Sequence, residues 1–168
     1  MNIINVEFKA RVDDSDVYEE KLAALWPVFK GIDHQLDTYF KTTHGRLKLR
    51  EGNIENALIQ YNRQDFAGAR QSQVMLYSHQ PNQTLKEILA LQFGVLKVVD
   101  KQRKIYFIEN VKFHFDKVKG LGDFIEVEAI DDKGERKESE LKAQCDHYAA
   151  FFGLSPDQFM EGSYSDMT

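Results

Sequence analysis

Charged and apolar residues alternate in several short segments spread along the chain. In residues 5–12 (NVEFKARV), Glu7, Lys9 and Arg11 are separated by apolar neighbours. A period of two is the pattern of a β-strand, whose successive side chains point to opposite faces of a sheet. Polar and charged residues recur at the same spacing at Arg46, Lys48 and Arg50, at Tyr61 and Arg63, at Lys101 and Arg103, at His114 and Asp116, and at Glu126 and Glu128. Apolar neighbours in these segments are Leu47 and Leu49, Phe113 and Phe115, and Ile125 and Val127.

The chain is therefore expected to consist mainly of strands, interrupted by helices. Strands are predicted in residues 5–12, 35–42, 46–51, 57–64, 72–79, 95–109, 111–120 and 123–131, and helices in residues 13–29, 84–93 and 138–152. About eight strands with short connections favour a closed sheet, because closure leaves no exposed strand edge. We predict an α+β fold in which residues 1–168 form one domain, a closed antiparallel β-barrel with helices packed outside.

The alternating charges allow two arrangements of such a sheet. In an ordinary half-buried sheet the charged face lies in water, which is common for antiparallel sheets. Amphipathic helices, however, need an apolar sheet face to cover, and a barrel that is apolar outside is charged inside. The alternation alone does not decide between the two arrangements, and the expected helices favour the charged interior.

Composition limits the class of partner and the compartment. The net charge is −5 and the sequence pI is about 5.6, so the surface lacks the overall basic field that duplex nucleic acid attracts. Cys145 is the one cysteine, which excludes an internal disulfide and fits the reducing cytoplasm. The N-terminal segment does not resemble a secretory signal, and no apolar run approaches the ~18 residues of a membrane span. We expect no nucleic acid and no membrane partner, and leave a homodimer open.

A charged barrel interior would require a charged ligand. Arg and Lys side chains suit phosphate oxygens, and Arg can bind them in a bidentate manner. One phosphate does not need so many cations, whereas a triphosphate does. Glu7, Glu126 and Glu128 could then hold Mg²⁺ or Mn²⁺, since these hard cations take carboxylate oxygens.

At these residues the chain resembles the CYTH family of triphosphate tunnel metalloenzymes, which includes class IV adenylyl cyclases and triphosphatases. NVEFKARV resembles the E-x-E-x-K signature of the family, and GRLKLRE and LIQYNR resemble its basic strands. The block DKQRKIYFIENVKFHFDKVKGLGDFIEVEA is similar to the later part of class IV adenylyl cyclases, and the closing SYSDM also fits.

The resemblance implies a tunnel that binds a triphosphate with the help of a divalent metal. It assigns phosphate binding to Lys9, Arg46, Lys48, Arg50, Arg63, Lys101 and Arg103. It assigns the metal to Glu7, Glu126 and Glu128, and catalysis to Lys9, Arg103 and Asp116. Asn5 departs from the signature, because it stands where the family usually has its first glutamate, and a neutral amide oxygen is a weaker metal ligand.

Three functions are consistent with this resemblance. The first is the class IV cyclase reaction, which converts ATP to cyclic AMP and pyrophosphate. The second is hydrolysis of thiamine triphosphate, tripolyphosphate or a nucleotide. The third is binding of a triphosphate or polyphosphate without turnover, in which Asn5 has removed a necessary metal ligand.

Other residues in the sequence carry weaker signals. His114 lies on the inward phase beside Asp116 and could act as a general base, although a hydrogen-bonded structural histidine is the commoner case. Cys145 is expected to pack as a small apolar side chain on the last helix. Gly120 and Gly122 lack the lysine and hydroxyl spacing of a phosphate-binding loop, so they predict a turn between two strands.

Overall fold

The computed structural model describes residues 2–63 and 67–167, apart from the side chains of Asn2 and Arg63. Its strands are β1 (Asn2–Val12), β2 (Val28–Phe40), β3 (Arg46–Glu51), β4 (Ala57–Arg63), β5 (Arg70–Ser78), β6 (Val95–Ile108), β7 (Val111–Val118) and β8 (Gly122–Asp131). Its helices are α1 (Ser15–Ala23), α2 (Gln83–Phe93) and α3 (Glu138–Phe152), followed by the short 3-10 turns η1 (Pro156–Gln158) and η2 (Tyr164–Asp166).

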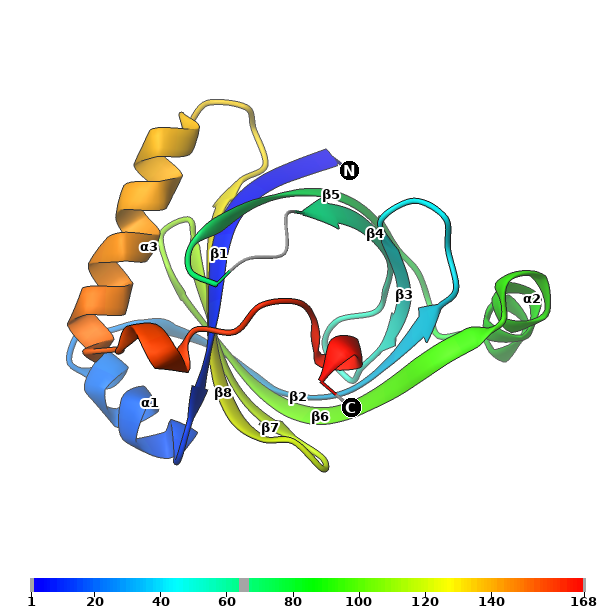
Figure 1. The fold of residues 1–168 in the computed structure, drawn as a ribbon, viewed down its shortest axis with the longest axis horizontal. Coiled ribbons are helices and arrows are strands. Elements are labelled where there is room, and N and C mark those ends of the chain that lie inside the picture. Colours follow the sequence, from blue (N-terminus) through cyan, green and yellow to red (C-terminus); the bar gives the residue numbers. More distant parts are fainter. Residues whose placement is uncertain (1, 64–66, 168) are drawn as a thin grey trace.

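Within these described residues, the eight strands close into one antiparallel barrel, as predicted. The order around the barrel is β1-β5-β4-β3-β2-β6-β7-β8, and β1 pairs with both β5 and β8 to complete the ring (Figure 1). No strand edge is left open in this ring, which removes the unpaired backbone groups that invite aggregation. The register also brings inward residues face to face, with Glu7 opposite Glu128 and Lys9 opposite Glu126.

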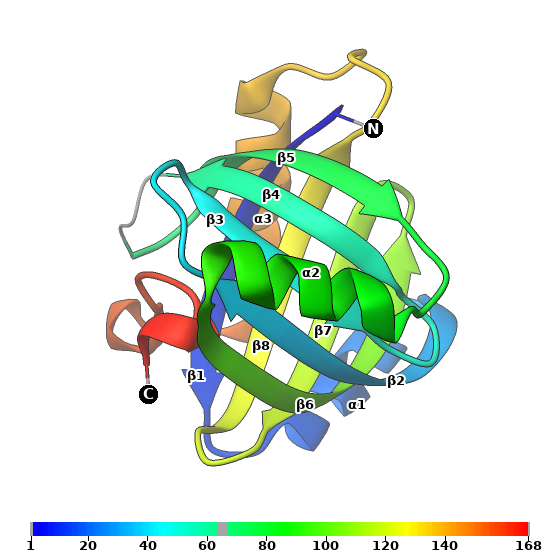
Figure 2. The ribbon, with the colours of Figure 1, turned by 90° about the vertical axis from the view of Figure 1, so that its right-hand side faces the viewer.

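The outer surface of the barrel is apolar where helices cover it. Figure 1 shows α1 and α3 together on one side, over β1, β7 and β8, and α2 on the opposite side. Beneath α3 lie Phe8 and Phe113, which belong to the same buried cluster as Leu141 and Cys145 of the helix. Figure 2 shows α2 crossing the outside of the other side of the barrel, where Leu89 packs with Leu49.

This packing explains the alternation in the sequence. On β1 and β7 the apolar residues Phe8 and Phe113 point outward to α3, whereas Lys9 and His114, one position further along, are buried inside the barrel. Lys101 and Arg103 are each only 2% exposed, so the arrangement in which the charges lie in water is wrong. Cys145 is fully buried, as expected for a small apolar side chain.

The first helix is shorter than the sequence pattern predicted. The prediction placed a helix over residues 13–29, whereas α1 ends at Ala23 and β2 begins at Val28. Pro27 accounts for the difference, because a proline disfavours helical dihedral angles in the residue before it. Trp26, the residue before Pro27, has a φ of 55°, outside the right-handed helical region, and is 91% exposed, not part of a buried helix face. The later helices agree with the prediction, and Gly94 and Gly153 cap them with positive φ.

The C-terminal segment returns to the barrel after α3. Figure 1 shows it running in front of the ring of strands, with η2 near one opening. The hydroxyls of Ser163 and Tyr61 are 2.6 Å apart, and Arg70 donates to the carbonyl of Gly162 at 2.9 Å. This segment therefore forms part of the barrel's interior surface at that end.

No helix in the described part of the chain is long and apolar enough to cross a membrane.

Candidate functional site

The barrel encloses a cavity of about 520 Å³ that is lined by side chains from all eight strands. Most of the residues predicted to bind phosphate or metal lie on its wall. These are Glu7, Lys9, Lys48, Arg50, Lys101, Arg103, Glu126 and Glu128. One enclosed space therefore holds both the cationic and the acidic groups that the sequence distributes over several strands.

Two of the predicted site residues, Arg46 and Asp116, are placed differently, and a third, Arg63, is not described. Arg46 does not line the cavity, and its guanidinium pairs with Asp166 of the C-terminal segment at 2.9 Å. Asp116 is fully buried behind the cavity wall. The side chain of Arg63 lies outside the described residues, so its predicted role stays a prediction.

The cations at one part of the wall gather around a carboxylate that the sequence analysis did not single out. Asp37 of β2 accepts hydrogen bonds from Arg50 at 2.9 and 2.8 Å and from Lys101 at 2.9 Å. Lys48 lies 3.2 Å from the same carboxylate. Burial opposes ionisation of Asp37, but Arg50, Lys101 and Lys48 outweigh burial and hold its pKa well below its usual range.

For Lys101, burial and repulsion from other cations outweigh the attraction of Asp37. Burial, followed by repulsion from Arg103, holds the pKa of the Lys101 ammonium well below its usual value, although Asp37 counteracts this. Cations in the same pocket thus repel one another and are only partly neutralised by the protein. An anionic ligand would relieve this repulsion, because it would bring negative charge to the same groups.

A second set of contacts connects Arg103 of β6 with Asp116 of β7, two of the residues predicted to take part in catalysis. Arg103 donates two hydrogen bonds to Asp116, at 2.7 and 2.6 Å, and the Tyr164 hydroxyl donates to the same carboxylate at 2.6 Å. Burial opposes ionisation of Asp116, but Arg103 lowers its pKa to about 2. The ammonium of Lys9 lies 3.6 Å from the centre of the Tyr164 ring, which is a cation–π contact.

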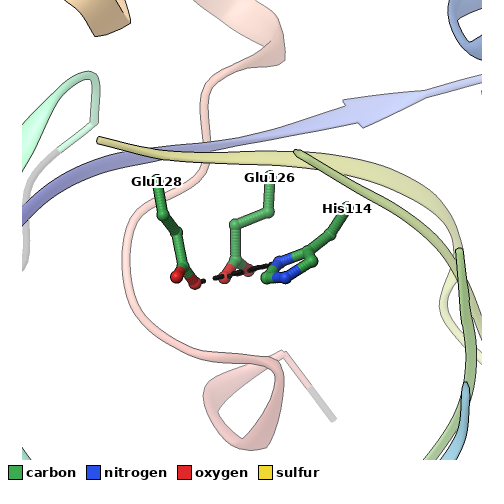
Figure 3. A group of neighbouring side chains, drawn as sticks. All are labelled: His114, Glu126 and Glu128. Carbon is green, nitrogen blue, oxygen red and sulfur yellow. Dashed lines mark ion pairs between the residues drawn. The ribbon is translucent and has the colours of Figure 1, made fainter. Parts of the chain in front are cut away.

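The two oxygens of Glu126 face different groups. Oε2 lies 3.0 Å from Lys9 and 3.7 Å from Arg103, on the cationic side of the cavity. Oε1 lies 3.5 Å from Nδ1 of His114, which is in turn 3.8 Å from Oε1 of Glu128 (Figure 3). Glu126 therefore stands between the cations and an acidic cluster, which we define as Glu126, Glu128 and His114.

The acidic cluster has the properties of a cation site. The ligand atoms of its three residues lie within 4.8 Å of one another. Burial, then the charge of Glu126 and that of Glu7, raise the pKa of Glu128 to about 8, because neighbouring carboxylates repel in a dry environment. Burial and then Arg103 lower the pKa of His114 to about 3, so the imidazole is neutral. A divalent cation would remove the repulsion between the carboxylates, so these residues fit such an ion.

Two further charged residues of the cavity were not among the predicted site residues. Glu55, in the loop between β3 and β4, pairs with Arg50 at 3.0 Å and also with Lys112 of β7. Lys112 shares the alternation of His114 and Asp116, so the sequence carried a signal for it. Glu55 follows no strand pattern, and only the folded loop brings it to the cavity.

The comparisons with known proteins agree with this geometry. A model of the CYTH domain matches residues 4–148. The chain belongs to the CYTH family. Among curated proteins, none matches this chain.

Solved structures similar to this CYTH chain include proteins from archaea, bacteria and plants. A protein of Pyrococcus horikoshii OT3 is 25% identical with a TM-score of 0.80, and the alignment covers 96% of this chain and 98% of that one. The "putative adenylate cyclase" of Vibrio parahaemolyticus is 19% identical with a TM-score of 0.79, over 98% and 97% of the two chains. A Hippeastrum protein, described as a "putative adenylyl cyclase" with a dominant triphosphatase activity, is 11% identical with a TM-score of 0.62, over 98% and 93%.

Within this CYTH barrel, Asn5 occupies the inward phase of β1, two residues before Glu7. It lines the cavity and is 5% exposed, and its side-chain oxygen has no hydrogen-bond partner among the described residues. A buried oxygen without a partner carries a free-energy cost of about 1–3 kcal/mol. The residue that departs from the family signature is therefore an unsatisfied acceptor on the cavity wall.

Proposed function

We propose that this chain is a metal-dependent enzyme that acts on an organic triphosphate inside the barrel, with cyclisation of ATP as its first candidate reaction. The observation that carries this proposal is the division of one cavity into a cationic side and an acidic side. Lys9, Lys48, Arg50, Lys101 and Arg103 would bind the phosphates. Glu7, Glu126 and Glu128 would hold Mg²⁺ or Mn²⁺.

The remaining wall of the cavity favours a triphosphate that carries an organic group. Ile3, Ile59, Val74, Leu76 and Ile130 line it in addition to the charged residues. Apolar side chains contribute nothing to an inorganic polyphosphate, whereas they can remove the surface of a base or another ring from water. The volume of about 520 Å³ also lies within the usual range of small-molecule sites.

In the proposed cyclisation, the 3′-hydroxyl of ATP gives its proton to water and its oxygen forms a bond to the α-phosphorus, while the bond from this phosphorus to the bridging oxygen breaks and pyrophosphate leaves. Lys9 and Arg103 would hold the phosphate oxygens and stabilise the negative charge that grows on them. A divalent cation supplies further charge stabilisation at these oxygens when it is bound. Catalysis would thus come mainly from positioning and electrostatics, which the fixed strands of a barrel can provide.

Asp116 would take part in this reaction through Arg103. Its carboxylate is bound to Arg103 and Tyr164 and does not line the cavity. A carboxylate with a pKa of about 2 is also a poor proton acceptor at neutral pH. We therefore propose that Asp116 is a positioning residue that fixes the guanidinium of Arg103.

The test is to incubate the purified protein with ATP, thiamine triphosphate and tripolyphosphate, each with Mg²⁺ or Mn²⁺, and to identify the products. Cyclic AMP with pyrophosphate supports the cyclase. Free phosphate supports a triphosphatase on the same scaffold, the activity described for the Hippeastrum relative. Tight binding without any product would reject an enzyme and leave a triphosphate binder.

A further inference from the structure

His114 is a buried histidine whose surroundings do not satisfy it. It is 0% exposed, and it points from β7 toward the carboxylates of Glu126 and Glu128 on β8 (Figure 3). Neither ring nitrogen has a hydrogen-bond partner among the described residues. Buried polar side chains are nearly always hydrogen-bonded, so an imidazole with two unsatisfied nitrogens requires an explanation.

A purely structural role does not supply this explanation. A structural histidine in a barrel interior would donate to one neighbour and accept from another. Here the neighbouring carboxylate oxygens are 3.5 and 3.8 Å from Nδ1, and they do not satisfy it. The His114 side chain is therefore buried at the acidic cluster without the hydrogen bonds that would offset the free-energy cost of burying its two nitrogens.

The distances within the cluster suit one shared ion. Two ligand atoms that each lie ~2.1 Å from a cation are ~3.0 Å apart when they subtend a right angle and ~4.2 Å apart when they lie on opposite sides. The separations of 3.5 and 3.8 Å between Nδ1 and the two carboxylates fall within this range. An ion placed there would also give the unsatisfied nitrogen its partner.

We propose that His114 is a ligand of the divalent cation, together with Glu126 and Glu128. This inference rests on the proposed function, because it concerns the metal of the same cavity. It changes the site from carboxylates alone to a mixed nitrogen and oxygen site. An imidazole suits transition metals, whereas Mg²⁺ prefers oxygen, so the site should favour Mn²⁺ or Co²⁺ over Mg²⁺.

The neutral imidazole of His114 is also relevant to Asn5, which stands where the family signature has a glutamate. A glutamate there would add a fourth negative charge to those of Glu7, Glu126 and Glu128. Asn5 leaves this charge out, and His114 contributes a donor atom without contributing a charge. The chain would then keep a metal ligand while reducing the repulsion between the acidic side of the cavity and a triphosphate.

The experiment uses Mn²⁺ alone as the probe, with electron-spin-echo spectroscopy to detect nitrogen bound to the ion. Wild-type protein should show coupling of Mn²⁺ to ¹⁴N, and labelling the histidines with ¹⁵N should replace that signal. His114→Gln should remove the coupling and weaken Mn²⁺ binding by about 10-fold or more, the scale on which even indirect metal contacts act. Mg²⁺ affinity should change by less than ~3-fold, since Mg²⁺ keeps oxygen ligands and water. His79→Gln is the matched control, because His79 lines the same cavity but is not part of the acidic cluster.

The possible outcomes separate this inference from the proposed function. Mn²⁺ that binds to wild-type protein without nitrogen coupling, or with equal affinity in His114→Gln, overturns the role of His114 and leaves a carboxylate site. Triphosphate turnover in a chelator, with no binding of Mn²⁺ to wild-type protein, overturns both the metal site and the metal dependence. The spectrum of the wild-type protein gives an answer even if His114→Gln does not fold.

Discussion

Both oxygens of Asp116 accept hydrogen bonds from the guanidinium of Arg103, at 2.7 and 2.6 Å. This pair keeps a planar cation in one orientation at the cavity wall, because a bidentate contact fixes the plane of the guanidinium. It also cancels part of the charge of Arg103. Neutralising the Asp116 carboxylate should therefore loosen the orientation of the Arg103 guanidinium and increase the net positive charge beside the cavity.

Asp116→Asn should separate binding from turnover. We expect triphosphate binding to stay equal or become tighter, because the substitution removes the negative charge that partly neutralises Arg103 behind the cavity wall. Turnover should fall by about 10-fold to 100-fold, because a misplaced catalytic group is costly. Steady-state kinetics with ATP would show a lower kcat with an equal or lower KM. Asp100→Asn, on the outer face of β6, is the control, and a variant whose KM rises while kcat is unchanged would argue against the positioning role.

Arg50→Ala should weaken triphosphate binding by about 1.5–3 kcal/mol, or roughly 10-fold to 150-fold in Kd, which is the range of hydrogen bonds to charged groups. Calorimetric titration with ATP measures this directly. Arg136→Ala removes an exposed arginine outside the barrel and should leave the affinity unchanged. Equal affinities in wild-type protein and Arg50→Ala would remove Arg50 from the phosphate site.

Glu126→Gln should affect turnover more than metal-free binding. We expect metal-dependent turnover to be lost, because the carboxylate serves the cation, while ATP still binds in the presence of a chelator because the Arg and Lys side chains remain. Binding is measured by titration with and without Mn²⁺, and Glu138→Gln on α3 is the exposed control. Equal loss of binding with and without metal would contradict the division of the cavity into two sides.

Asn5→Glu should strengthen Mn²⁺ binding, since it adds a carboxylate two residues from Glu7 on the same face of β1. The gain should appear only with metal, because in its absence the new charge repels Glu7 and lowers stability. Metal titrations and thermal unfolding with and without Mn²⁺ test both parts. No change in either quantity would place residue 5 outside the metal site.

Asp37 should make stability depend on pH in the acid range. Its pKa is lowered in the folded protein, so its contribution is complete above the unfolded value of about 3.9 and is lost as the pH falls through the lower folded value. Asp37→Asn should therefore be less stable than wild-type protein at pH 7, and the difference should narrow in acid. Tripolyphosphate should restore part of the stability at pH 7, because it brings negative charge to Lys48, Arg50 and Lys101. A stability difference that is independent of pH would reject this explanation.

The sequence was sufficient to predict the closed barrel and the family, because both depend on patterns local to each strand. The period of two in residues 5–12 says which side chains share a face. It does not say which strands are neighbours, so it could not show that Asp37 pairs with Arg50 across β2 and β3. Those contacts follow from the register, which is set by the whole barrel.

Two other differences between the sequence predictions and the structure have separate causes. The overlong first helix could have been avoided, since Pro27 was visible in the sequence and marks a helix boundary. Glu55 could not have been found, because its loop has no periodic pattern and reaches Arg50 only after folding. The role of His114 was left open because its unsatisfied nitrogens are a property of three-dimensional packing.

The closed ring of strands makes the cavity tolerant of substitution and intolerant of length change. The charged groups are spread over several strands, so the side chain at position 5 of β1 can be exchanged without shifting the groups on β6 or β8. Deleting one residue such as Gln102 would instead turn Lys101 or Arg103 outward and bring its neighbours into the lumen. Relatives with altered chemistry should therefore differ by point substitutions at inward positions, and insertions should be confined to the connections between strands.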